Sequence, residues 1–257
     1  MSARPPHASP DATENRRSRR AGLAIAGFLY LALALFITWP VVTDPSRLVI
    51  GGDHTDIWKH LWGWWRTDRA IFHYHELPYA VRDVNHPSHG VLYHIDFLNS
   101  LIVIPLSRMF GMILGANLLI WGQLVAGALA MFALARDFVG RQIPAFVSGL
   151  IYGFAPYVLT LGLASGVSER MNLAWMPLFF LAVFRLLNRY RLRYFLGAGA
   201  AFFLAALGCW KYAMFIYVLM VFSPPIGSSF PSCRCCSAIV DTRSHCAINT
   251  ENLFCTG

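Results

Sequence analysis

Charged residues are scarce in this sequence. Only 13% of its 257 residues are charged, whereas 56% are hydrophobic and the mean hydropathy is +0.50, which is not the composition of a soluble protein. The net charge of +8 would suit a nucleic-acid-binding protein. However, the basic residues cluster at the ends of apolar runs, which is typical of membrane proteins. We therefore expect a lipid bilayer as partner and no nucleic acid.

Cysteine is almost absent before Ser223. Five of the six cysteines follow this residue (Cys233, Cys235, Cys236, Cys246 and Cys255). Cys233-Arg234-Cys235-Cys236 lacks the two-residue gap by which paired thiolates share a zinc ion. A metal or disulfide module is thus disfavoured. For residues 223–257 we expect either a disordered Cys/Ser-rich tail or sequence from a lost reading frame after Phe222.

Long apolar runs predict a membrane protein. Residues 21–42 carry no charge and are long enough to cross the roughly 30 Å hydrocarbon core. This run is too long for a signal peptide and has no small-residue cleavage site, so we expect a retained helix after a disordered basic tail at residues 1–20. Further runs occupy residues 114–135, 143–163, 171–187 and 194–222. We predict an all-α polytopic transmembrane domain over residues 21–222, with about five to six spans.

The distribution of arginines predicts the topology. The apolar run 97–110 is short for a span. If it does not cross and the N-terminus is cytoplasmic, all arginine-rich connections lie inside (Arg136, Arg141, Arg185, Arg189, Arg191 and Arg193), as the positive-inside rule requires. Residues 43–96 then form an outer, periplasmic loop. We predict that 97–110 is a juxtamembrane helix, interfacial or re-entrant, at the outer leaflet.

The last apolar run has a charge in its interior. As one helix, residues 194–222 would span roughly 43 Å at 1.5 Å per residue, more than the core requires. Lys211 interrupts this run. A return helix starting near Tyr212 and a single tilted helix are both open interpretations.

The outer loop holds most of the reactive side chains. It contains seven of the thirteen acidic residues and seven of the nine histidines. Near its start, Gly51-Gly52-Asp53-His54-Thr55-Asp56 precedes a tryptophan-rich amphipathic helix. Asp53 is either the N-cap of this helix, with Asp56 at the capping-box position, or a general base or metal ligand. At helical spacing Asp53, Asp56 and His60 share one face and converge.

The histidines are open to a metal interpretation. His73-x-His75 and His86-x-x-His89 have spacings at which two histidines can bind one metal ion. However, no HExxH signature is present, and a solvated histidine-rich loop is the favoured alternative. We instead expect a single divalent cation, Mg²⁺ or Mn²⁺, held by Asp53, Asp56 and a substrate phosphate.

Other polar residues are candidates for substrate binding. Glu169 and Arg170 lie in a short outer connection and are either solvated or face the same cavity mouth as Asp53. Lys211 either extends to the headgroups or pairs with a lipid phosphate. The full predicted substrate-binding set is His60, His94, Asp96, Glu169, Arg170 and Lys211.

The order of these features resembles a known family. A first span leads to Gly-Gly-Asp-x-x-Asp, then to an aromatic helix, a juxtamembrane helix and a span ending in Ala-Leu-Ala-Arg (Gly51–Asp56, Asn85-His86-Pro87-Ser88-His89-Gly90-Val91-Leu92-Tyr93, Asn99–Phe110 and Ala133–Arg136). Over residues 21–222 the chain resembles the amino-terminal part of bacterial GT-C membrane glycosyltransferases. This class includes protein O-mannosyltransferases and the lipid A aminoarabinose transferase.

The resemblance implies a function and a location. The family transfers a sugar from a polyprenyl-phosphate donor at the outer face of the bacterial inner membrane. An early acidic residue of the first outer loop is the catalytic base, in some members with a bound cation. This implies Asp53 first and Asp56 second, although His54 stands where the family commonly has Glu. Full-length members have more spans and often an outer carboxy-terminal domain, so a truncated, inactive fragment is a further expectation.

Two other functions are compatible with the sequence. A transporter or flippase would need charged residues in mid-membrane, which are almost absent besides Lys211. A non-catalytic membrane component is favoured by the short length and the Cys-rich tail.

Overall fold

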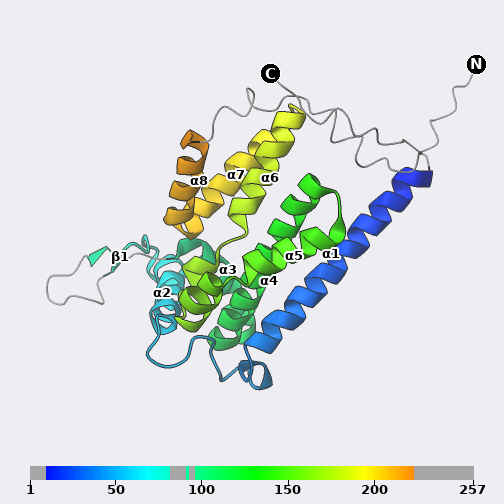
Figure 1. The fold of residues 1–257 in the computed structure, drawn as a ribbon. Coiled ribbons are helices and arrows are strands. Elements are labelled where there is room, and N and C mark those ends of the chain that lie inside the picture. Colours follow the sequence, from blue (N-terminus) through cyan, green and yellow to red (C-terminus); the bar gives the residue numbers. More distant parts are fainter. Residues whose placement is uncertain (1–9, 82–90, 93–95, 223–257) are drawn as a thin grey trace, which may run out of the picture. The chain divides into compact units, whose positions relative to one another are not determined.

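The structure is a computed structural model that describes residues 10–81, 91–92 and 96–222 (Figure 1). Its main elements are the helices α1 (Pro10–Ile37), α2 (Ile57–Arg69), α3 (Phe97–Phe110), α4 (Met112–Val139), α5 (Gln142–Gly153), α6 (Trp175–Asn188), α7 (Leu192–Gly208) and α8 (Trp210–Phe222). Four short helical segments connect them, namely η1 (Val41–Thr43), η2 (Ala70–Tyr74), η3 (Val158–Ala164) and η4 (Ser168–Met171). The predicted all-α class is confirmed. The described residues outside the helices include one antiparallel pair of two-residue strands, β1 (Ala80–Val81) and β2 (Val91–Leu92).

The polytopic membrane fold is also confirmed. Within the described chain, three helices are long and apolar enough to cross a membrane: Arg20–Ile37, Met112–Val139 and Ser168–Asn188. A fourth span exists if α5 and η3, bent by 49°, count as one. The sequence predicted five to six. The number is lower because α7 and α8, into which the run 194–222 divides, are each short, and because α5 ends just before Pro156, where proline disfavours helix in the preceding residue.

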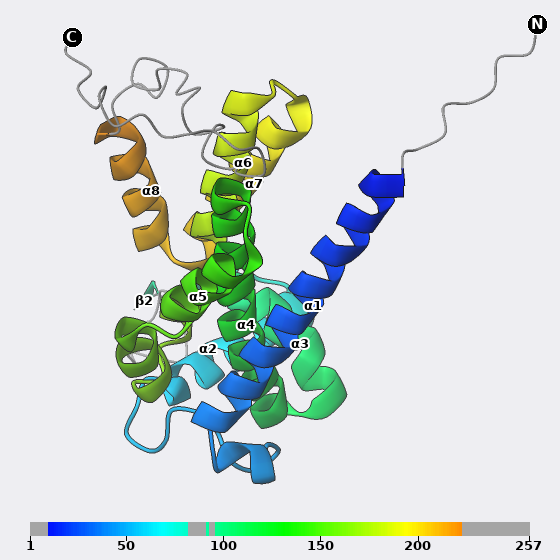
Figure 2. The same ribbon diagram turned by 45° about the vertical axis from the view of Figure 1, so that its right-hand side comes forward.

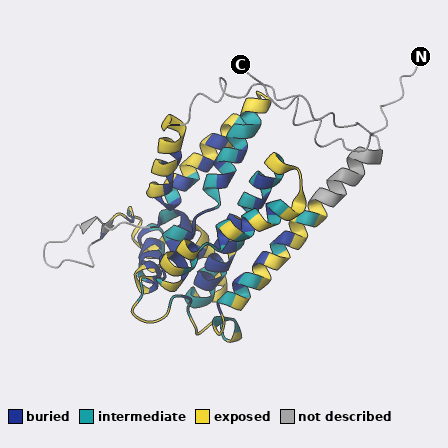
Figure 3. Ribbon diagram, in the orientation of Figure 1, coloured by how far each residue is buried: buried dark blue, intermediate teal, exposed yellow. Residues whose placement is uncertain are grey.

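The described residues up to Ile216 form one compact unit, and the packing described below is that of this unit. Buried and exposed residues alternate along its helices (Figure 3), and many of the exposed residues are large and apolar. Phe28 and Phe36 of α1 are exposed, whereas Tyr30 and Ala34 are fully buried. An exposed apolar face on a long helix is suited to lipid.

Small residues let α4 and α5 approach closely. A Cβ at Gly149 would lie 2.5 Å from the Ala128 carbonyl oxygen, and one at Gly153 would lie 2.7 Å from the Ala128 Cβ. Two glycines four residues apart form the small-residue face by which membrane helices pack. Tyr30 of α1 completes the contact, because its hydroxyl donates to the Phe146 carbonyl at 2.8 Å.

The last apolar run is broken near Lys211, which decides between the two interpretations that the sequence left open. Helix α7 ends at Gly208, Cys209 is extended (φ −156, ψ 103), and α8 begins at Trp210 (Figure 2). Lys211 lies in the first turn of α8. The single tilted helix is therefore excluded. The helix predicted over residues 97–110 is present with those bounds as α3, and its place at the outer leaflet stays a prediction.

Asn117 of α4 anchors the start of the segment that connects α1 to α2. Its side chain is fully buried. Its Oδ1 accepts from the Ile50 amide at 3.0 Å, and its Nδ2 donates to the carbonyls of Pro45 (2.9 Å) and Leu48 (2.7 Å). One side chain thus satisfies three backbone groups of the segment that leads into Gly51.

We expect Asn117→Leu to destabilise the protein by about 2–4 kcal/mol, because it leaves three backbone groups without their partner. The measurement is thermal unfolding in detergent. Asn188→Ala is the control, since Asn188 is exposed and its side chain donates only to Phe184 O of its own helix. Equal effects of the two substitutions would contradict the anchoring role.

Candidate functional site

The predicted catalytic aspartates lie in a loop and not on a helix. Gly51, Gly52 and His54 have positive φ (116°, 77° and 57°), so the chain turns here and α2 begins only at Ile57. Asp56 occupies the N-cap position, but its side chain makes no capping hydrogen bond. The predicted cap role of Asp53 and capping-box role of Asp56 are therefore wrong.

The predicted convergence of Asp53, Asp56 and His60 is wrong for the same reason. Asp53 and Asp56 are exposed, and the Asp56 carboxylate lies 3.6 Å from the Lys59 ammonium. His60 is buried on α2, only 4% exposed. The three residues do not share a helical face because the helix starts after the first two.

The loop of Asp53 is held against the connection that precedes η4. The Asp56 amide donates to the Ser165 carbonyl at 3.1 Å. A Cβ at Gly51 would lie 3.1 Å from the Gly166 Cα, and a Cβ at Gly166 would lie 2.7 Å from the Ile57 nitrogen. This contact, called here the loop clamp (residues 51–57 on 165–166), places Asp53 and Asp56 on the segment that continues into Glu169 and Arg170.

A buried polar cluster lies beside the loop clamp. Its members come from α2, the start of α3, α4 and the η4 region, and each is less than a tenth exposed. We call it the Asp96 cluster; it comprises His60, Asp96, Asn99, Gln123, Ser168 and Asn172.

Hydrogen bonds connect the Asp96 cluster through one carboxylate oxygen. Asp96 Oδ2 accepts from Asn99 Nδ2 at 2.5 Å and from Ser168 Oγ at 2.6 Å. His60 Nδ1 lies 3.9 Å from the same oxygen. The Gln123 amide continues the chain by donating to Asn99 Oδ1 at 2.7 Å and to Asn172 Oδ1 at 3.0 Å. The cluster thereby ties η4 to α3 and α4.

Asp96 titrates near neutrality. Burial raises the pKa of Asp96 to about 7, although the hydrogen bonds from Ser168 and Asn99 act in the opposite direction. The negative charge of Glu169 raises the pKa further, so Glu169 lies within electrostatic range of Asp96. Asp96 is therefore able to hold or release a proton at physiological pH.

The other predicted binding residues take different positions. Glu169 and Arg170 are half-buried in η4, and Arg170 Nη1 donates to the Leu161 carbonyl at 3.2 Å. Lys211 is exposed, and the neighbouring Tyr212 hydroxyl donates to the Arg170 carbonyl at 2.5 Å, which joins the start of α8 to η4. His94 lies outside the described residues.

No group of three or more His, Cys, Asp or Glu side chains in the described part of the chain is placed to hold a metal ion. The predicted cation site therefore contains two protein ligands, the exposed carboxylates of Asp53 and Asp56. This site stays a prediction. Mg²⁺ is commonly held by one or two carboxylates together with substrate phosphates, so this pair fits such an ion.

Sequence reasoning missed four members of the Asp96 cluster: Asn99, Gln123, Ser168 and Asn172. Gln123 and Asn99 lie within apolar runs, where an uncharged polar side chain needs a partner. That need was the available signal. It identifies residues that require partners, but it does not say which residues the partners are.

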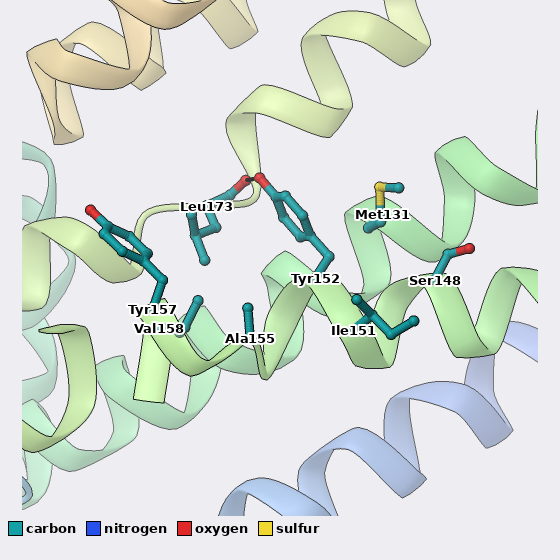
Figure 4. A pocket seen from close by; sticks show the side chains of 8 residues that line it. All are labelled: Met131, Ser148, Ile151, Tyr152, Ala155, Tyr157, Val158 and Leu173. Atoms are coloured by element: carbon teal, nitrogen blue, oxygen red, sulfur yellow. Dashed lines mark hydrogen bonds between the residues drawn. The ribbon is translucent and has the colours of Figure 1, made fainter. Parts of the chain in front are cut away.

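Figure 4 shows an apolar hollow. Two of its lining residues, Val158 and Leu173, come shortly before and after residues 165–166 of the loop clamp in the sequence. The hollow has a volume of about 440 Å³ and lies between α4, α5, η3 and Leu173. The Tyr152 hydroxyl, at its wall, donates to the Leu173 carbonyl at 2.9 Å. The remaining lining is largely aliphatic (Met131, Ser148, Ile151, Ala155, Tyr157 and Val158). A hydrocarbon chain fits such a surface.

Comparison with known proteins gave no matching family model, no matching curated protein and no matching solved structure.

Proposed function

We propose that the protein is a membrane glycosyltransferase that moves a sugar from a polyprenyl-phosphate donor to an acceptor at the outer face of the bacterial inner membrane, with its N-terminus cytoplasmic. The observation that carries the proposal is the loop clamp. It brings two exposed carboxylates, Asp53 and Asp56, onto the segment that bears Glu169 and Arg170. Val158 and Leu173, which line the apolar hollow, precede and follow this segment in the sequence.

The chemistry of such a donor requires this arrangement. A polyprenyl chain cannot leave the bilayer cheaply, because each buried CH₂ contributes about 0.8 kcal/mol. The reacting groups must therefore lie at the edge of membrane-spanning helices. The hollow beside α4 and α5 offers a place for the chain, and the clamped loops offer polar groups for the headgroup.

The proposed reaction is a direct displacement. Asp53 accepts the proton of an acceptor hydroxyl, whose oxygen forms a bond to the anomeric carbon. The bond between that carbon and the phosphate oxygen breaks, and its electron pair leaves with the polyprenyl phosphate. In this proposal the cationic side chains of Arg170 and Lys211 stabilise the leaving phosphate. A divalent cation held by Asp53 and Asp56 would supply further charge neutralisation there.

We expect Asp53→Asn to lower sugar transfer by about 100-fold or more, the usual contribution of a general base, and Asp56→Asn to lower it less. The assay follows cleavage of radiolabelled undecaprenyl-phosphate hexoses by the protein in nanodiscs. Asp44→Asn is the matched control, because Asp44 is a loop carboxylate that contacts only Ser46 and Arg47 by its side chain. Unchanged transfer in Asp53→Asn would remove Asp53 from the mechanism. Movement of the donor across the bilayer without cleavage would identify a flippase.

A further inference from the structure

A second hollow lies at the arginine-rich end of the helices. It has a volume of about 360 Å³ and lies where α4 and α6 end and α7 begins. Its lining is polar and basic, in contrast to the apolar hollow described above. The lining residues are Asp137, Phe184, Arg185, Asn188, Arg189 and Tyr194.

Asp137 fixes one arginine of this hollow. Arg185 Nε donates to Asp137 Oδ2 at 2.6 Å, and the Arg185 side chain remains 40% exposed. The bond uses Nε, so the two terminal nitrogens of the guanidinium are left to donate to another group. Packing of Phe138 on Phe184, with ring centroids 4.0 Å apart, holds the ends of α4 and α6 together beside this pair. Arg185 is thus preorganised.

The hollow remains positive after this pairing. Asp137 offsets the charge of Arg185, which leaves Arg189, exposed at the end of α6, as the uncompensated charge of the lining. Arg191, just before α7, and Arg193, in its first turn, are both exposed. Arg193 donates to the Tyr194 hydroxyl at 2.8 Å, so its charge lies beside the lining. An anion with several acceptor oxygens complements this surface.

Apolar side chains around the hollow identify the kind of anion. Leu187 and Leu192 are 43% and 71% exposed, and Phe138 is 57% exposed at the end of α4. Both α4 and α6 belong to segments able to span the membrane, so this end lies at headgroup depth. A ligand here meets basic groups on one side and acyl chains on the other. Basic pockets between membrane helices bind anionic lipid headgroups in this way.

We propose that this hollow is a binding site for the headgroup of an anionic phospholipid, with Arg185 and Arg189 on its phosphate and the acyl chains along Phe138, Leu187 and Leu192. The site is separate from the proposed transfer site and does not depend on it. The lipid binds at the C-terminal ends of α4 and α6, whereas the loop clamp lies toward the opposite end of these helices.

The test is native mass spectrometry of the delipidated protein with phosphatidylglycerol and, separately, phosphatidylcholine. We expect phosphatidylglycerol to bind at least about tenfold more tightly, the equivalent of one charge-assisted hydrogen bond. Arg189→Gln is expected to abolish this preference, and Arg189→Lys to retain part of it. The double variant Arg185→Gln/Asp137→Asn keeps the net charge of the lining. It is expected to weaken the binding of phosphatidylglycerol by about the same factor as Arg189→Gln.

Arg141→Gln is the matched control, because it removes one exposed charge from the same end of the protein without touching the lining. General surface attraction predicts about a fivefold loss per arginine at most. Equal losses in Arg141→Gln and Arg189→Gln would overturn the proposal in favour of diffuse electrostatics. Equal binding of both lipids would also overturn it. Displacement of phosphatidylglycerol by millimolar inorganic phosphate would reassign the hollow to a free anion and reject the lipid.

Discussion

Gly166→Ala is expected to destabilise the protein by about 2–5 kcal/mol and to abolish sugar transfer. Gly166 has φ +66°, and an added Cβ would lie 2.7 Å from the Ile57 nitrogen and 2.8 Å from the Ile57 Cβ. The left-handed backbone costs an alanine about 1–2 kcal/mol, and forcing an extra carbon into packed atoms costs about 1–3 kcal/mol. The Ile57 backbone cannot rotate away as a flexible side chain would. The loop clamp must therefore open, and Asp53 moves away from η4.

Gly52→Ala separates the two causes. Gly52 has φ +77°, but nothing lies within 4 Å of an added Cβ. We expect this variant to lose only about 1–2 kcal/mol, the backbone cost. Thermal unfolding followed by tryptophan fluorescence reports the stability, and the nanodisc assay reports transfer. If both variants lost the same stability, the close approach of Gly166 to Ile57 would not matter. If Gly166→Ala lost stability but kept transfer, the clamp would not position the site.

The fold was predictable where it depends on local features. The bounds of α3 follow from the length of its apolar run. The position of Lys211 marked where the last run could break, and a single tilted helix remained open until the structure showed the end of α7 at Gly208. The number of spans was not predictable in the same way. Whether α5 and η3 make one span depends on a 49° bend, which arises where the chain passes Pro156. Run length and composition carry no information on such an angle.

The site was predictable only in part. Sequence reasoning selected His60 and Asp96 separately, but it did not place them 3.9 Å apart. It also assigned Asp53 to a helix, because it could not foresee that His54, a residue with a Cβ, adopts a positive φ. The Asp96 cluster joins residues as far apart as His60 and Asn172. Such contacts follow from how α2, α3 and α4 pack, which periodicity does not specify.

Asp96→Asn is expected to remove most of the pH dependence of stability between about pH 4 and 7. The pKa of Asp96 is raised from 3.8 to about 7 in the folded protein, so the folded state binds this proton more tightly than the unfolded state. The stability contributed by the proton is fully present below about pH 4 and is lost as the pH rises through about 7. At 1.36 kcal/mol per pKa unit, the loss amounts to about 4 kcal/mol. Asparagine is a neutral isostere, and its variant should not suffer this loss.

Two neighbouring groups must be separated from the carboxyl. In the described residues, His60 faces Asp96 from α2 and Glu169 acts on it from η4. Thermal midpoints measured from pH 5 to 8 for the wild type, Asp96→Asn, His60→Gln and Glu169→Gln assign the titration. We expect the fall with pH to persist in His60→Gln, to end at lower pH in Glu169→Gln, because the Glu169 charge that raises the pKa of Asp96 is removed, and to disappear in Asp96→Asn. A fall that persisted unchanged in Asp96→Asn would assign the titration to another group.

The protonation of Asp96 has a consequence for η4. Ser168 and Asn99 both donate to Oδ2, so these bonds strengthen when the carboxyl ionises, while the buried charge then faces the negative Glu169. Ser168 directly precedes Glu169 and Arg170, so any shift of Ser168 moves these two residues. We therefore expect sugar transfer by the wild type to show an inflection near pH 7 that Asp96→Asn lacks. An identical pH profile in the two proteins would confine Asp96 to a role in stability.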